Sequence, residues 1–63
     1  QAEGNFKIAE YYEKKRKWAG AEIYYNEAAD LVPDTEIGTK ALQRLDEVKR
    51  KREAMEAAKE ADK

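Results

Sequence analysis

Apolar side chains recur at the spacing of an α-helix in three successive segments of the chain. The first segment, from Asn5 to about Lys15, carries a broad apolar face made of Phe6, Ile8, Ala9, Tyr11 and Tyr12. Such a face at helical spacing is typical of an amphipathic helix. Asn5 is the expected N-cap, because its side-chain oxygen can accept a hydrogen bond from a backbone N–H of the first turn.

The second segment runs from Trp18 to Val32 and carries a narrower apolar stripe. Its members follow one another at intervals of three and four residues: Trp18, Ala21, Tyr25, Ala28 and Val32. Pro33 comes next, and its ring disfavours helix in the preceding residue and lacks the N–H that a helix needs. We therefore expect this helix to end at Val32. A turn of about two residues separates the two segments, which predicts an antiparallel hairpin.

The third segment starts after Pro33. Asp34 and Thr35 offer cap oxygens for a helix, and Glu36 lies near its positive end. Gly38 in the first turn costs about 1 kcal/mol relative to alanine, so we expect this turn to fray most easily.

Beyond Val48 the third segment becomes a mixture of alanine and charged residues, after a stripe formed by Ile37, Ala41, Leu42, Leu45 and Val48. Oppositely charged residues four positions apart support a helix there by about 0.2–0.5 kcal/mol per pair. The pairs are Asp46–Arg50, Glu47–Lys51, Lys49–Glu53 and Arg52–Glu56. We expect one helix over residues 36–62, whose C-terminal half extends as a free charged overhang. The fold class is therefore all-α, a single domain over residues 1–63 with three helices that alternate in direction.

Composition narrows the possible functions of these helices. The 13 basic and 14 acidic residues give a formal net charge of -1, and the chain has no cysteine, histidine or serine. The usual nucleophiles and the thiolate and imidazole metal ligands are therefore missing. We expect no enzymatic activity, no catalytic residue, no cofactor and no metal ion. Since no run of about 18 apolar residues occurs, we expect no membrane-spanning segment either.

Residues 2–35 resemble one tetratricopeptide repeat, a helix–turn–helix unit of about 34 residues. Six residues match its pattern in one ungapped register: Ala9, Tyr12, Ala21, Tyr25, Ala28 and Pro33. The resemblance implies that the alanines let two helices approach closely while the tyrosines fill the space around them. Three positions depart from the pattern: Asn5 replaces a large aromatic residue, Arg16 a glycine in the turn, and Ala29 a leucine.

The third helix begins like a second repeat. Pro33-Asp34-Thr35 followed by Ala41-Leu42-x-x-Leu45 is similar to the lengthened repeats of the tetratricopeptide lipoprotein of the bacterial outer-membrane barrel-assembly machine and of its periplasmic relatives. The resemblance implies a terminal repeat whose third helix caps the array with a polar outer face. It assigns nine residues to packing within and between repeats: Ala9, Tyr12, Trp18, Ala21, Tyr25, Ala28, Pro33, Leu42 and Leu45.

The first residue and the resemblance bear on the origin of the chain. The chain begins with Gln1 rather than methionine, and we therefore expect it to be a piece of a longer protein. The lipoprotein resemblance implies a periplasmic or outer-membrane-associated protein. Without it, the cytoplasm is the expected compartment.

Tetratricopeptide arrays hold peptides against a concave face built by successive first helices. Carried over to this sequence, that face would consist of Glu3, Phe6, Glu10, Glu13, Lys14, Lys40, Gln43, Glu47, Arg50 and Lys51. The lysine and asparagine pattern of chaperone-binding members is missing, since Phe6 and Glu10 stand at the corresponding places. We therefore expect a non-enzymatic interaction or scaffold module whose partner is a protein, a peptide or upstream repeats.

Two other functions stay open from the sequence. The basic runs 14–17 and 49–52 could bind nucleic acid or an anionic membrane, with exposed aromatic rings such as Tyr11 and Tyr24 as stacking platforms. A net charge near zero favours solvated helix faces over this function. The neighbouring carboxylates Glu10 and Glu13 could hold a metal or act in acid/base chemistry, but without a histidine, a pocket or a third carboxylate at fixed spacing we expect them to be solvated as well. The chain could also be a purely structural cap, or associate with itself through exposed helix faces.

Overall fold

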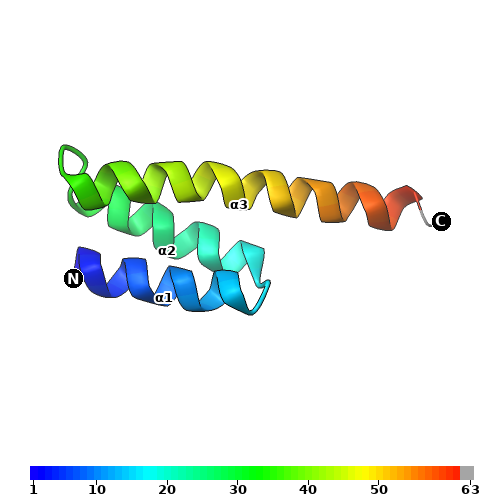
Figure 1. The fold of residues 1–63 in the computed structure, drawn as a ribbon, viewed down its shortest axis with the longest axis horizontal. Coiled ribbons are helices and arrows are strands. Elements are labelled where there is room, and N and C mark those ends of the chain that lie inside the picture. Colours follow the sequence, from blue (N-terminus) through cyan, green and yellow to red (C-terminus); the bar gives the residue numbers. More distant parts are fainter. Residues whose placement is uncertain (62–63) are drawn as a thin grey trace.

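The computed structural model describes residues 1–61 of the chain, and the side chains of residues 1–59. The described part contains three helices: α1 (Ala2–Lys14), α2 (Trp18–Leu31) and α3 (Glu36–Ala61). Each helix runs antiparallel to the one before it, and α2 lies between α1 and α3 (Figure 1). The predicted all-α arrangement of three helices is thus confirmed. The expected end of the third helix at residue 62 lies outside the described residues.

The third helix is about twice as long as the other two. It has 26 residues against 13 in α1 and 14 in α2. At about 1.5 Å per residue it measures close to 40 Å, which accounts for most of the 42 Å length of the molecule. Its C-terminal half continues past the loop that joins α1 to α2 (Figure 1). Among the residues that the structure describes, no helix is long and apolar enough to cross a membrane.

Small side chains dominate the core. The buried apolar residues are Ala9, Ala21, Tyr25, Ala28, Ala29, Ala41 and Val48. Alanines on facing helices let the backbones approach closely, and aromatic rings fill the space beside them. The ring of Phe6 lies edge-on to that of Tyr25 with centroids 5.3 Å apart, and Tyr12 stacks on Tyr24 at 5.6 Å. Because α1 and α3 both pack mainly on α2, this helix forms the centre of the molecule.

The first helix begins earlier than the sequence predicted. It starts at Ala2 with Gln1 as N-cap, and Asn5 is inside it, donating its backbone N–H to the Gln1 carbonyl at 2.9 Å. The predicted cap at Asn5 is therefore wrong. Alanine is a strong helix former and Glu3 lies near the positive end of the helix, so the additional turn is favourable.

The loop between α1 and α2 has the hydrogen bonds of a Schellman motif. The backbone N–H of Arg16 donates to the Glu13 carbonyl, and that of Lys17 to the Tyr12 carbonyl, both at 2.9 Å. In this motif the residue after the C-cap adopts a left-handed conformation and is usually glycine. Here it is Arg16, with φ of 59°. Arg16 therefore adopts the backbone conformation that glycine favours.

The second turn depends on Thr35 and Gly38. The second helix ends at Leu31, one residue before its predicted end, and Val32 is its C-cap. The Thr35 hydroxyl accepts a hydrogen bond from the Gly38 N–H at 3.1 Å and donates one to the Val32 carbonyl at 2.7 Å. Thr35 thus acts as the N-cap that the sequence suggested. A Cβ on Gly38 would lie 2.1 Å from the Val32 oxygen. Glycine at this position therefore lets the first turn of α3 approach the Val32 carbonyl closely.

Leu42 differs from the packing role expected for it. It is 52% exposed, whereas Ala41 and Val48 are fully buried. Successive residues of a helix are rotated by about 100° around its axis. Since α3 turns Ala41 and Val48 towards α2, Leu42 points away from that contact and into solvent.

Candidate functional site

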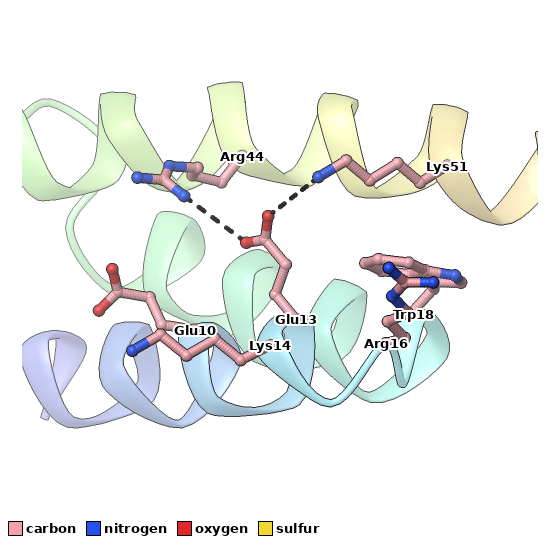
Figure 2. A pocket seen from close by; sticks show the side chains of 7 residues that line it. All are labelled: Glu10, Glu13, Lys14, Arg16, Trp18, Arg44 and Lys51. Carbon is pink, nitrogen blue, oxygen red and sulfur yellow. Dashed lines mark hydrogen bonds and ion pairs between the residues drawn. The ribbon is translucent and has the colours of Figure 1, made fainter.

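An open groove lies between α1 and α3, beside the α1–α2 loop. Its volume is about 450 Å³, and seven residues line it: Glu10, Glu13, Lys14, Arg16, Trp18, Arg44 and Lys51. Figure 2 shows these side chains, with α1 and α3 on opposite sides. We call it the α1–α3 groove.

Glu13 joins all three helices at the floor of this groove. One of its oxygens, Oε1, accepts a hydrogen bond of 2.7 Å from the Tyr25 hydroxyl on α2. The same oxygen lies 3.7 Å from Arg44 Nη1, and the other lies 3.4 Å from Lys51 Nζ, both on α3 (Figure 2). The side chain is only 14% exposed, so the expected solvated position of Glu13 is wrong. We call Glu13, Tyr25, Arg44 and Lys51 the Glu13 cluster.

The Glu13 cluster is electrostatically matched. Burial raises the pKa of the Tyr25 hydroxyl, and the hydrogen bond to Glu13 raises it further. The hydroxyl therefore keeps its proton and stays a donor. A partly buried carboxylate that has one hydroxyl donor and two cations nearby has its charge compensated. Glu13 is consequently part of the floor that fixes the groove, whereas Glu10 and Lys14 remain accessible along its rim.

Trp18 connects the groove to the C-terminal half of α3. Lys51 Nζ lies 5.5 Å from the centroid of its ring, and its indole N–H donates to the sulfur of Met55. Beside it, Arg52 donates to Glu22 on α2 and to Glu56 on its own helix. The predicted free overhang is therefore wrong as far as Met55, because Arg52 and Met55, which follow the apolar stripe of α3, contact Glu22 and Trp18 on α2.

Only part of the predicted peptide-binding face lines the groove. Glu10, Glu13, Lys14 and Lys51 do. The other six residues lie elsewhere: Phe6 packs on Tyr25, Lys40 pairs with Glu36, Arg50 pairs with Asp46, and Glu3, Gln43 and Glu47 are exposed outside it.

Sequence reasoning missed Arg44 as a groove residue. The resemblance to the repeat set the expected rotation of the third helix, and this rotation placed Gln43 and Arg50 on the predicted peptide-binding face. The groove instead receives Arg44, one residue beyond Gln43, together with Lys51, which the predicted face already included. These two cations flank the buried Ala41 and Val48 stripe at the same interval of seven residues. That coincidence is the signal that could have identified Arg44.

The two basic runs differ in the structure. Three of the four cations of the second run are paired, Arg50 with Asp46, Lys51 with Glu13, and Arg52 with Glu22 and Glu56. The first run, residues 14–17, is exposed at the end of α1 and in the loop. Within the part of the chain that the structure describes, its four side chains form no ion pair.

No family model matches the chain, and no curated protein or solved structure matches it either. In the described residues, no group of three acidic side chains is placed to hold a metal ion.

Proposed function

We propose that the chain is a non-enzymatic protein-interaction module of the tetratricopeptide type, in which α1 and α2 form one repeat and α3 caps it. The burial of the small repeat positions supports this proposal, since Ala9, Ala21 and Ala28 are 0% exposed. So does the order of packing, in which α2 separates two helices that run in the same direction.

The observation that carries the proposal is the α1–α3 groove itself. Its walls are the two helices that would form the ligand-binding face of an array, and accessible charges from Glu10 and Lys14 line its rim. The Glu13 cluster fixes the distance between the walls from below. A preformed groove binds a ligand at a lower entropic cost than a mobile one. This arrangement suits the capture of a peptide segment without chemistry.

Nucleic-acid binding has less support from the same residues. Stacking of a base needs a free aromatic face. Lys51 lies over the ring of Trp18, Lys15 lies 5.6 Å from the centroid of Tyr11, and Tyr12 and Tyr24 stack on each other. Three of the four cations of the second basic run also pair with carboxylates.

A selection of random peptides displayed on phage tests the proposal, with the intact purified chain as the immobilised target. We expect selected peptides whose affinity falls when Lys14, on the groove rim, is replaced in Lys14→Glu. Lys49→Glu is the matched control, because Lys49 lies in a separate hollow beside Ile23 and Asn26. Failure to select any peptide would contradict the proposal and favour a structural cap, and so would selection of peptides that Lys49→Glu weakens as much as Lys14→Glu.

A further inference from the structure

A second hollow adjoins the α1–α3 groove at the loop. It lies between the loop and the C-terminal half of α3, has a volume of about 270 Å³, and is lined by Arg16, Trp18, Ala19, Arg52, Met55, Glu56 and Lys59. Arg16 and Trp18 also line the α1–α3 groove. The two hollows therefore form one elongated surface. We call the second hollow, between the loop and the C-terminal half of α3, the loop–tail surface.

Positive charge collects along these two hollows. Together they contain six basic side chains and only three acidic ones, in a chain whose formal net charge is -1. The carboxylate of Glu13 is matched by Arg44 and Lys51, and that of Glu56 by Arg52. Lys14 and Arg16 are exposed and pair with no carboxylate in the described part of the chain. The surplus positive charge is therefore available to a ligand.

An apolar strip lies between these cations. Trp18 is half-buried and Met55 is 44% exposed, and the two side chains touch through the indole N–H and the sulfur. Methionine is a flexible and polarisable side chain that adapts to different apolar partners. A ligand that fits this surface would place an apolar side chain on the strip and negative charges on either side of it.

We propose that this surface binds an acidic peptide segment. An apolar side chain of the peptide lies against Trp18 and Met55, and its flanking carboxylates lie near Lys14, Arg16 and Lys59. The inference rests on the proposed interaction function and names the chemistry of the partner. It also extends the binding site beyond the two helices of the groove to the loop and the overhanging half of α3.

A peptide suits the surface better than a nucleic acid does. The carboxylate of Glu10 lies among the cations and would repel a continuous phosphate backbone. Stacking a base on Trp18 would have to displace Lys51 from the ring. A peptide can instead place discrete carboxylates at the cations and offer backbone N–H groups to Glu10.

Fluorescence titration tests this inference, because Trp18 is the only tryptophan of the chain. The full chain is titrated with three probes: a glutamate-rich peptide with one central leucine, the same peptide with glutamine in place of glutamate, and a single-stranded oligothymidylate. We expect the acidic peptide to bind more tightly than the other two, by about tenfold, which corresponds to about 1.4 kcal/mol. Its affinity should fall as salt is added, since the contacts are between exposed charges.

Two charge reversals locate the contact. Arg16→Glu should weaken binding of the acidic peptide by about tenfold. This loss is larger than that for deleting one exposed ion pair, because the reversal replaces an attraction with a repulsion. Lys17→Glu is its control, because Lys17 is the next residue of the loop and lines neither hollow. Lys59→Glu should also weaken binding, and its exposed position near the end of the described helix keeps it away from the fold of the hairpin.

The outcomes separate this inference from the proposed function. Equal binding of the glutamate and glutamine peptides would overturn the inference, as would tighter binding of the oligothymidylate or equal losses in Arg16→Glu and Lys17→Glu. If selected peptides depend on Lys14 but show no preference for acidic residues, the interaction function stands and only the inference fails. If no peptide of any composition binds, both fail.

Discussion

The hydroxyl of Tyr25 donates a hydrogen bond of 2.7 Å to the carboxylate of Glu13. This contact ties α1 to α2, and the same carboxylate lies within ion-pair distance of Arg44 and Lys51 on α3. One acidic side chain therefore sets the position of both walls of the α1–α3 groove. The fold and the candidate site depend on the same four residues.

Removing the Tyr25 hydroxyl should destabilise the fold. Tyr25→Phe keeps the ring that fills the core but deletes the donor to Glu13. A hydrogen bond to a charged group contributes about 1.5–3 kcal/mol, so we expect a loss of that order in the free energy of unfolding. Urea denaturation followed by circular dichroism measures it. Tyr24→Phe, at a half-buried ring with no such partner, is the control, and an equal small effect in both variants would contradict the role of the Glu13 contact.

The same hydroxyl predicts a pH dependence at alkaline pH. Its pKa is raised in the folded chain above the ordinary value of 10.0, mainly by burial and then by the hydrogen bond to Glu13. The folded chain thus holds this proton more tightly than the unfolded chain does. The stabilisation is complete below pH 10.0 and is lost as the pH rises above it. Unfolding free energies should fall more steeply above this pH for the natural chain than for Tyr25→Phe, and parallel curves would argue against it.

Alanine substitutions at two glycines should change the stability of the chain in opposite directions. Gly38→Ala would place a Cβ 2.1 Å from the Val32 carbonyl oxygen, whereas nothing lies within 4 Å of a Cβ on Gly4. We expect Gly38→Ala to destabilise the chain by about 1–3 kcal/mol through overpacking. Gly4→Ala should stabilise it by up to about 1 kcal/mol through helix propensity. Thermal unfolding of both variants checks this, and a stabilising Gly38→Ala would mean that the second turn is looser than the structure shows.

Replacing Arg16 in the loop between α1 and α2 with glycine should stabilise the folded chain. Arg16 adopts a left-handed conformation at φ of 59°, which costs a residue with a Cβ roughly 1 kcal/mol or more. Arg16→Gly removes this strain, although it increases the freedom of the unfolded chain. We expect a net stabilisation of a few tenths of a kcal/mol to about 1 kcal/mol. Arg16→Val should destabilise the chain, because a β-branched residue tolerates this conformation poorly. The reverse order of the two unfolding midpoints would contradict the assigned conformation.

Shortening α3 should have an effect that depends on where the chain ends. A chain ending at Glu53 lacks Met55, which contacts Trp18, and Glu56, which pairs with Arg52. We expect it to lose about 1 kcal/mol, as is common for removing partly exposed contacts. A chain ending at Ala57 keeps both contacts and should unfold at nearly the same urea concentration as the full chain. Equal stability of all three chains would mean that the tail does not pack on the hairpin.

The sequence predicted the helices well because their signals are local. Helical spacing of apolar residues, the break at Pro33 and the cap at Thr35 each act within a few residues. The fully buried Ala9 lies on the apolar face of the first helix, and Ala21 and Ala28 lie on the stripe of the second, so all three could be identified from the sequence. The position of the first cap could not, because a weak preference of Asn5 competed with the favourable helix formers before it.

The site was harder to predict because it depends on contacts between distant residues. The sequence alone indicates that Glu13 is an ordinary surface carboxylate on α1. Only the positions of Tyr25 and Arg44 in the structure show that its side chain is mostly buried. The rotation of α3 decides whether Gln43 or Arg44 faces the groove. The contact of Met55 with Trp18 depends on how far α3 runs along α2. The seven-residue interval shared by Arg44, Lys51 and the buried stripe indicates the rotation, but no spacing within the chain specifies the contacts of Glu13 and Met55.

The measurement that tests the account most directly is a map of backbone amide chemical shifts on addition of a selected peptide. We expect changes clustered on residues 10–16 of α1 and the loop, on Trp18, and on residues 44–59 of α3. We expect little change at Leu42 and Gln43 on the outer face, or at Ile8 and Leu31 on the hairpin. A map centred on the outer face of α3 or on the hairpin would contradict the claim that the groove and the loop–tail surface bind the partner.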